Sequence, residues 1–160
     1  ALLELDQLVR KGLRQDMPNS ESDDGCDAAL VRIDLKTRSL AFVGAKINLY
    51  EIHPNGQVEQ HKAHRMSLGY RDHPLNKPET QHWEAPSGSR FVMVTDGVTD
   101  QLGGPNLKPI AFGYQRMLNA LTIASPGKAE GIAHQLIQAT DAWQGSQARR
   151  DDLTILVFEV

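Results

Sequence analysis

Acidic residues stand beside two apolar segments of this 160-residue chain. Asp96 comes just after the run Phe91-Val92-Met93-Val94, and Asp151 and Asp152 directly precede the apolar run 153–160. Carboxylate oxygens are the ligands that hard cations such as Mg²⁺ and Mn²⁺ prefer, and a water bound to such a cation is a nucleophile near neutral pH. If the two runs are neighbouring strands of one sheet, their ends would bring Asp96 and Asp151 to one cation position.

The same acids also fit a role without a metal. Asp96 would then cap a turn, and Asp151 and Asp152 would be solvated acids beside Arg149 and Arg150. Acids are common where loops begin, so spacing alone favours this second interpretation.

Composition narrows the class of protein. The length suits one domain with a core, and the hydrophobic content of 40% and charged content of 23% are ordinary for a globular chain. The net charge is −3 without a basic block, which argues against nucleic acid as a partner. The single cysteine, Cys26, excludes an internal disulfide framework and fits a reducing compartment. The sequence has no apolar stretch of membrane-spanning length, so we expect a cytoplasmic segment without membrane contact. A longer protein that contains this segment could still carry a membrane anchor elsewhere.

The first sixteen residues predict an amphipathic helix, because leucines recur at helical spacing with charged residues between them. No N-cap residue precedes this helix. We therefore expect the chain to be a piece of a longer protein, cut just before or inside the helix.

Strand patterns dominate the middle of the chain. The segments 27–35 and 39–45 flank a turn-like Lys-Thr-Arg and predict a hairpin. A second hairpin is predicted around Asn55-Gly56, the strongest short hairpin signal, and residues 90–94 predict a buried strand.

Two helices and a last strand complete the pattern. The first helix has Pro109 near its start, and the second has Ser125 as N-cap and Pro126 at its first position. The run 153–160 predicts the closing strand. Strands, then a helix pair, then a strand indicate the α+β class.

Other candidate ligands and nucleophiles favour ordinary roles. Four histidines, His61, His64, His73 and His82, lie in one region, but residues three apart on a strand point to opposite faces and no cysteine pair supports a zinc site. Side chains of surface loops are the favoured interpretation. No motif places a histidine beside Cys26, which we interpret as a structural or loop thiol.

Three segments together resemble the PP2C type (PPM) of metal-dependent protein phosphatases, in particular the bacterial branch typified by the stage II sporulation protein E. They are "TDGVTDQLGG" (95–104), "WQGSQARRDDLTIL" (143–156) and "DDGCDAALVRID" with "LAFVGAKINLY" (23–34 and 40–50). The matches follow one another in family order from the first helix to the C-terminus.

The resemblance implies a four-layer α-β-β-α sandwich of two antiparallel sheets. It also implies a two-metal Mn²⁺ or Mg²⁺ centre whose water attacks a phosphoserine or phosphothreonine. On this resemblance Asp96 and Asp151 are the metal ligands and catalytic residues, while Asp152 would lie just outside the ligand shell. Asp100 is not a ligand on this match, and we expect it to bond backbone amides of its loop.

The family's early Gly-Asp element, whose aspartate bridges both metals, has no match in this sequence. We therefore interpret residues 1–160 as the C-terminal portion of a single PP2C-like domain, incomplete or inactive alone. We expect it to expose an apolar sheet edge or face and to pair with another copy or with the missing segment. The alternative is a catalytically silent PP2C-like module for binding or dimerisation. The implied partner of the phosphatase is a phosphorylated regulatory protein of the anti-sigma-factor-antagonist kind.

Overall fold

The computed structural model describes residues 1–17, 23–71, 77–105 and 107–160, so His73 lies outside the described residues. The chain divides into two units. The first comprises Ala1–Leu49 and His61–Ala85, and the second Tyr50–Gln60 and Pro86–Val160. Each unit has its own sheet and its own buried apolar cluster.

The first unit contains the helix α1 (Leu2–Gly12) and an antiparallel sheet in the order β1-β2-β5. The strands are β1 (Ala28–Asp34), β2 (Ser39–Ala45) and β5 (Gln81–Glu84). The expected hairpin of β1 and β2 is confirmed, and its turn is stabilised because Asp34 Oδ1 accepts the N–H groups of Lys36 (2.9 Å) and Thr37 (3.2 Å). Leu2 of α1 packs with Val43, Ala45 and Leu68.

The second unit contains a four-stranded sheet in the order β4-β3-β6-β9. Its strands are β3 (Leu49–Ile52), β4 (Val58–His61), β6 (Arg90–Val94) and β9 (Ile155–Glu159). Its helices are the short α2 (Asp96–Thr99) and the longer α3 (Gly113–Ala124) and α4 (Ala129–Gln144). A small hairpin of β7 (Leu102–Gly103) and β8 (Ile110–Ala111) lies between α2 and α3 in the chain.

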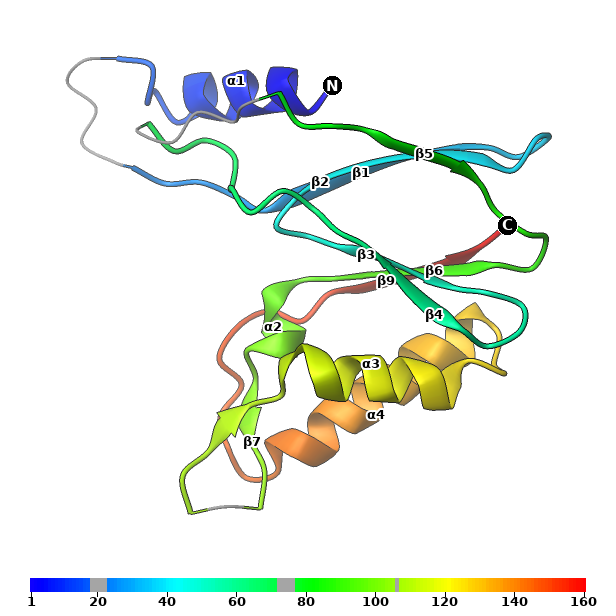
Figure 1. Cartoon of the computed structure of the whole chain (residues 1–160). Coiled ribbons are helices and arrows are strands. Elements are labelled where there is room, and N and C mark those ends of the chain that lie inside the picture. The colour runs from blue at the N-terminus through cyan, green and yellow to red at the C-terminus, as the bar shows by residue number, and fades with distance from the viewer. Residues whose placement is uncertain (18–22, 72–76, 106) are drawn as a thin grey trace. The chain divides into compact units, whose positions relative to one another are not determined.

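The helices α3 and α4 lie side by side along one face of this sheet (Figure 1). Tyr50, Ile52 and Val92 alternate along β3 and β6, so they share the face that meets the helices. The helices contribute fully buried side chains to the same cluster: Met117, Leu121, Ile132 and Leu136. The buried cluster thus packs the helices against β6 and β9, the two strands beside the candidate site.

The predicted α+β class with antiparallel sheets is confirmed, as is the hairpin through Asn55-Gly56. Gly56 has a φ of 86° and donates its N–H to His53 O (2.8 Å), a backbone conformation that glycine adopts readily. Among the described residues, no helix has both the length and the apolarity needed to cross a membrane.

Both predicted helix starts are wrong. Pro109 does not open α3, because Ile110 pairs with Gly103 in the hairpin of β7 and β8. Ser125 does not cap α4; it follows the last residue of α3, and α4 begins after Lys128. The intervening turn is fixed from outside the two helices, since the Arg90 guanidinium donates to Gly127 O (2.8 Å).

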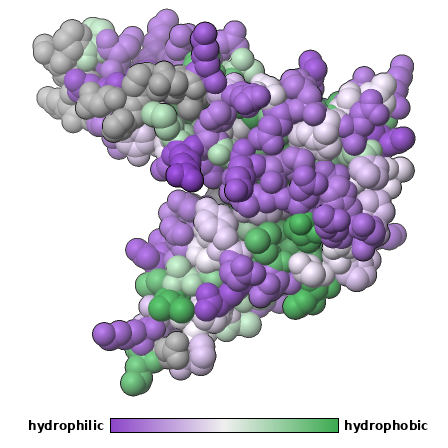
Figure 2. All heavy atoms as spheres, viewed as in Figure 1, coloured by the Kyte–Doolittle hydropathy of each residue, from purple (hydrophilic) through white to green (hydrophobic). Residues whose placement is uncertain are grey.

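Hydrophilic side chains cover most of the face seen in Figure 2, and apolar residues form separate patches on it. Large apolar side chains that are exposed come from different elements and loops, among them Leu8, Leu35, Leu107 and Ile123. The expected pairing of an apolar sheet edge with a second copy stays a prediction.

Candidate metal centre

The strands that carry the two predicted ligands are neighbours in the second unit's sheet. β6 and β9 are antiparallel, and Val94, the last residue of β6, pairs with Ile155, the first residue of β9. The chain therefore leaves β6 and enters β9 at the same edge of the sheet. Asp96 lies two residues beyond this edge, and Asp151 lies four residues before it.

Thr95 joins the two segments by hydrogen bonds. Its N–H donates to Thr154 O (3.1 Å), and its hydroxyl accepts the N–H of Thr154 (3.0 Å). The same hydroxyl donates to Asp152 O (3.2 Å). Because the Thr95 side chain is used in this way, it does not cap α2, although Thr95 occupies the N-cap position.

Gly97 allows the closest approach of the two segments. A Cβ at this position would overlap the main-chain carbonyl of Asp152 and would lie 3.4 Å from Asp151 O. Any other residue would force the start of α2 away from the Asp151–Asp152 segment. The close approach thus explains why glycine follows Asp96 in the sequence motif.

The carboxylates of Asp96, Asp151 and Asp152 are exposed beside this close approach. Asp151 Oδ1 accepts the N–H of Asp152 (2.7 Å), and that bond orients the Asp151 side chain. These oxygens fit Mg²⁺ or Mn²⁺ in kind. Within the described ranges, however, no group of three or more His, Cys, Asp or Glu side chains is arranged to hold a metal ion.

Asp100 is exposed and ends the short helix α2, where its N–H donates to Asp96 O (2.7 Å). Its carboxylate accepts a long hydrogen bond from the Thr99 hydroxyl (3.4 Å). The side chain thus contacts its own loop through a hydroxyl, whereas the sequence predicted backbone amides as its partners.

Sequence reasoning did not single out Gln101 as part of the site. This side chain is 1% exposed, and its Nε2 donates to Leu102 O (3.0 Å) and Ala148 O (3.1 Å). It therefore contacts the loop that carries Asp151. Its neighbours in the sequence are Asp100 and Leu102, so no local apolar pattern indicates that it is buried.

Three of these four histidines, His61, His64 and His82, are described, and they lie in different local structures. His61 stacks on Trp83, with ring centroids 4.0 Å apart and an angle of 15° between the planes. His64 Nε2 accepts the N–H of Glu79 (2.9 Å), and His82 is exposed on β5. These contacts support ordinary structural roles.

Cys26 and Arg149 also have local partners. The Cys26 N–H donates to Leu68 O (3.0 Å), and partial burial, together with the charges of Asp27 and Asp6, raises the pKa of its thiol. A raised pKa leaves less thiolate at neutral pH, which argues against a nucleophile. Arg149 forms an ion pair with Asp141 (2.7 Å).

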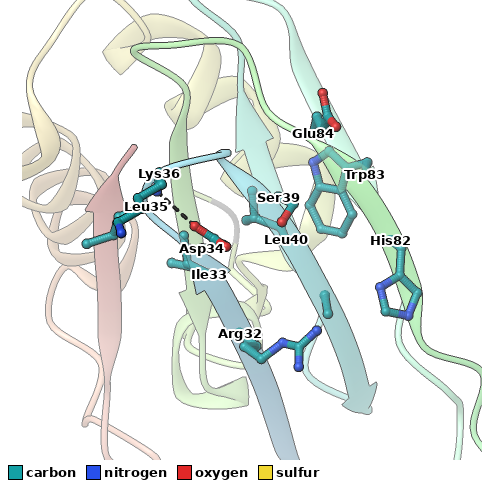
Figure 3. Close-up of a pocket in the computed structure, with 11 residues that line it drawn as sticks. Arg32, Ile33, Asp34, Leu35, Lys36, Ser39, Leu40, His82, Trp83 and Glu84 are labelled. Carbon is teal, nitrogen blue, oxygen red and sulfur yellow. Dashed lines mark hydrogen bonds between the residues drawn. The ribbon is translucent and has the colours of Figure 1, made fainter.

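A pocket lies on the first unit and is lined by residues of β1, β2 and β5 and of the turn between β1 and β2 (Figure 3). Arg32, Asp34, His82 and Glu84 line it, together with Trp83. None of the acids predicted as metal ligands belongs to this pocket.

Comparison with known proteins gives a family. The family model described as "Stage II sporulation protein E (SpoIIE)" matches residues 1–160. The search of curated proteins gave no match.

Solved structures share the fold. The SiaA-PP2C domain of Pseudomonas aeruginosa is 30% identical with a TM-score of 0.78, and the match covers 94% of this chain and 57% of that domain. RsbX in complex with magnesium is 17% identical with a TM-score of 0.59, over 96% of this chain and 61% of that one. The phosphatase domain of SpoIIE from Bacillus subtilis is 16% identical with a TM-score of 0.59, over 99% and 71%.

The chain therefore spans 57% of the first of these structures and 61% of the second. Because the family model matches the whole chain and the solved phosphatase domains share its fold, the chain belongs to the stage II sporulation protein E (SpoIIE) family and has a PP2C-type serine/threonine phosphatase fold.

Proposed function

We propose that this chain is the C-terminal portion of a metal-dependent serine/threonine protein phosphatase. Its substrate would be a phosphorylated bacterial regulatory protein of the anti-sigma-factor-antagonist kind. The observation that carries the proposal is the junction of β6 and β9, where Thr95 and Gly97 bring Asp96 and Asp151 to the same sheet edge.

Asp96 and Asp151 would hold the Mn²⁺ or Mg²⁺, and Asp152 would support them from the adjoining position. When bound, such an ion supplies a water whose pKa is low enough to attack the phosphoester near neutral pH. Asp96 and Asp151 would contribute negative charge beside the adjoining ends of β6 and β9, and their exposure would leave the phosphate a path to the site.

The test replaces one charge in the full-length protein. Asp151→Asn keeps the shape and one oxygen of the side chain but removes a negative charge that a hard cation requires. We expect phosphate release from a phosphorylated partner with Mn²⁺ to fall by about 100-fold or more, and the fold to be unchanged because the side chain is exposed. The measurement is kcat/KM, with circular dichroism as the check of the fold.

Asp100→Asn is the matched control, since it makes the same change in an exposed acid near the same sheet edge. We expect it to retain most activity. If Asp151→Asn retains most activity, or if Asp100→Asn is the more damaging variant, the assignment of Asp151 as a ligand is wrong.

A catalytically silent binding or dimerisation module is the second candidate. The observation in its favour is that no group of three or more potential ligands lies together among the described residues. Wild-type full-length protein that neither binds Mn²⁺ nor releases phosphate would support this candidate over the phosphatase.

A further inference from the structure

Gln101 is a buried polar side chain of the second unit. It lies between α2, which begins with Asp96, and β7. Its main-chain carbonyl accepts the N–H of Phe112 (2.8 Å), which binds Gln101 to the start of α3. This bond ties the main chain of Gln101 to Phe112, a member of the buried cluster of this unit.

The amide of Gln101 reaches the loop that carries Asp151. Its Nε2 donates to Ala148 O (3.1 Å), and Ala148 lies three residues before Asp151. On the other side of Asp151, the Thr95 hydroxyl donates to Asp152 O (3.2 Å). Asp151 thus lies between two points at which side chains from the β6–α2–β7 segment bind the main chain of its loop.

This loop, residues 145–154, has no helix or strand of its own. An irregular segment depends on such contacts for a defined position, because it lacks the hydrogen bonds of a regular element. The side chain of Asp151 therefore takes its position from the loop's attachments at residues 148 and 152.

Burial of a glutamine amide at this place is energetically unfavourable on its own. Gln101 Oε1 is buried and has no hydrogen-bond partner among the described residues. A methionine would fill a similar volume without that unpaired acceptor. What the glutamine supplies, and methionine would not, is the pair of hydrogen bonds to Leu102 O and Ala148 O.

We propose that Gln101 is a positioning residue for Asp151: its bond to Ala148 O holds the loop so that the Asp151 carboxylate stays at the sheet edge beside Asp96. The inference rests on the proposed function for the role of Asp151, but the effect of Gln101 on the loop is a property of the apoprotein. It can therefore be measured without metal.

The first measurement is amide hydrogen exchange of the metal-free, full-length protein. In Gln101→Met, we expect the amides of residues 148–154 to exchange about tenfold faster, since one of the two attachments is lost. Thr140→Val is the matched control, because Thr140 is fully buried in α4 and its hydroxyl donates to Leu136 O (2.9 Å) of its own helix, not to the loop. Exchange in residues 148–154 should not change in that variant.

The second measurement is Mn²⁺ affinity by titration calorimetry. Loss of a group that orients a ligand typically weakens metal binding by about 10- to 100-fold, so Gln101→Met should bind Mn²⁺ that much more weakly and Thr140→Val should bind like wild type. Activity of Gln101→Met should recover as Mn²⁺ is raised, which a general loss of fold would not allow.

The outcomes separate the inference from the proposed function. If wild-type protein binds no Mn²⁺ and releases no phosphate, the proposed function fails, while faster exchange in Gln101→Met still supports the attachment of the loop by Gln101. Unchanged exchange in residues 148–154 overturns the inference, whatever the activity. Unchanged Mn²⁺ affinity of Gln101→Met, in a protein whose wild type binds Mn²⁺, overturns it as well.

Discussion

Gly97 lies where α2 meets the Asp151–Asp152 segment, and a methyl group there would overlap the Asp152 carbonyl. We predict that Gly97→Ala separates the two segments, lowers the free energy of unfolding by about 1–3 kcal/mol, and weakens Mn²⁺ binding. Urea denaturation and Mn²⁺ titration of the full-length protein measure the two effects.

Gly131 provides the matched control for Gly97. It lies within α4, and a Cβ built there has no atom within 4 Å. Gly131→Ala should therefore stabilise the protein by about 0.5–1 kcal/mol, because alanine is the better helix former. If both variants change stability in the same direction, the close approach of Gly97 to the Asp152 carbonyl does not determine the effect of Gly97→Ala.

The positions of Asp96 and Asp151 near strand ends could be predicted because each lies one residue away from an apolar run in the sequence. The residues that bring the two ends together could not. Thr95 and Gln101 act through hydrogen bonds to residues 152–154 and 148, and contacts across such separations leave no local pattern. The ligand roles of Asp96 and Asp151 themselves stay predictions.

Trp143, near the end of α4, binds the hairpin of β7 and β8 to the helix. Its indole N–H donates to Ile110 O (3.1 Å), its carbonyl accepts the N–H of Gly104 (2.8 Å), and Arg116 lies over its ring at 3.9 Å from the centroid. Gly104 has a φ of 97° and lies against the ring, where a Cβ would be 2.8 Å from ring atoms. Trp143 therefore contacts the hairpin through both its side chain and its main chain.

We predict that Trp143→Phe loosens the hairpin while α3 and α4 stay folded. Phenylalanine keeps an aromatic ring but loses the indole donor and part of the contact with Arg116. Amides of residues 102–104 and 110–111 should exchange about tenfold faster, and those of α3 serve as the internal control. Equal acceleration in α3 would instead indicate a general loss of stability.

At the scale of elements, the residue types typical of turns and helix caps predicted the hairpins correctly but predicted the helix starts incorrectly. The β1–β2 and β3–β4 turns are local, since Asp34 and Asn55-Gly56 determine them within a few residues. The Ser125-Pro126-Gly127 turn contains the residues of a helix start, but Arg90 binds Gly127 O and α4 begins later. The short elements α2, β7 and β8 lack the length that periodicity requires, and they were not predicted.

Among the described residues, two apolar clusters of unequal size are present, one in each unit. The cluster of the first unit contains four buried residues, and that of the second contains eleven. Burial of apolar area is the main stabilising term, so the larger cluster should give the second unit the greater resistance to unfolding. That unit also carries Asp96 and Asp151, and a stable frame suits a site whose ligands must keep their positions.

Leu136 tests the importance of the larger cluster. It is fully buried in α4, while its neighbour Ile137 is 40% exposed. We predict that Leu136→Ala lowers the free energy of unfolding by about 2–5 kcal/mol, because it removes buried methyl groups and leaves a cavity under the sheet. Amide exchange should accelerate in β6, α3 and α4 together, since these elements share the cluster.

Ile137→Ala makes a similar truncation one position along the same helix, and it should change stability by less than about 1 kcal/mol, as expected for an exposed site. Similar losses from both variants would mean that the cluster around Leu136 does not support the unit that holds the candidate metal centre.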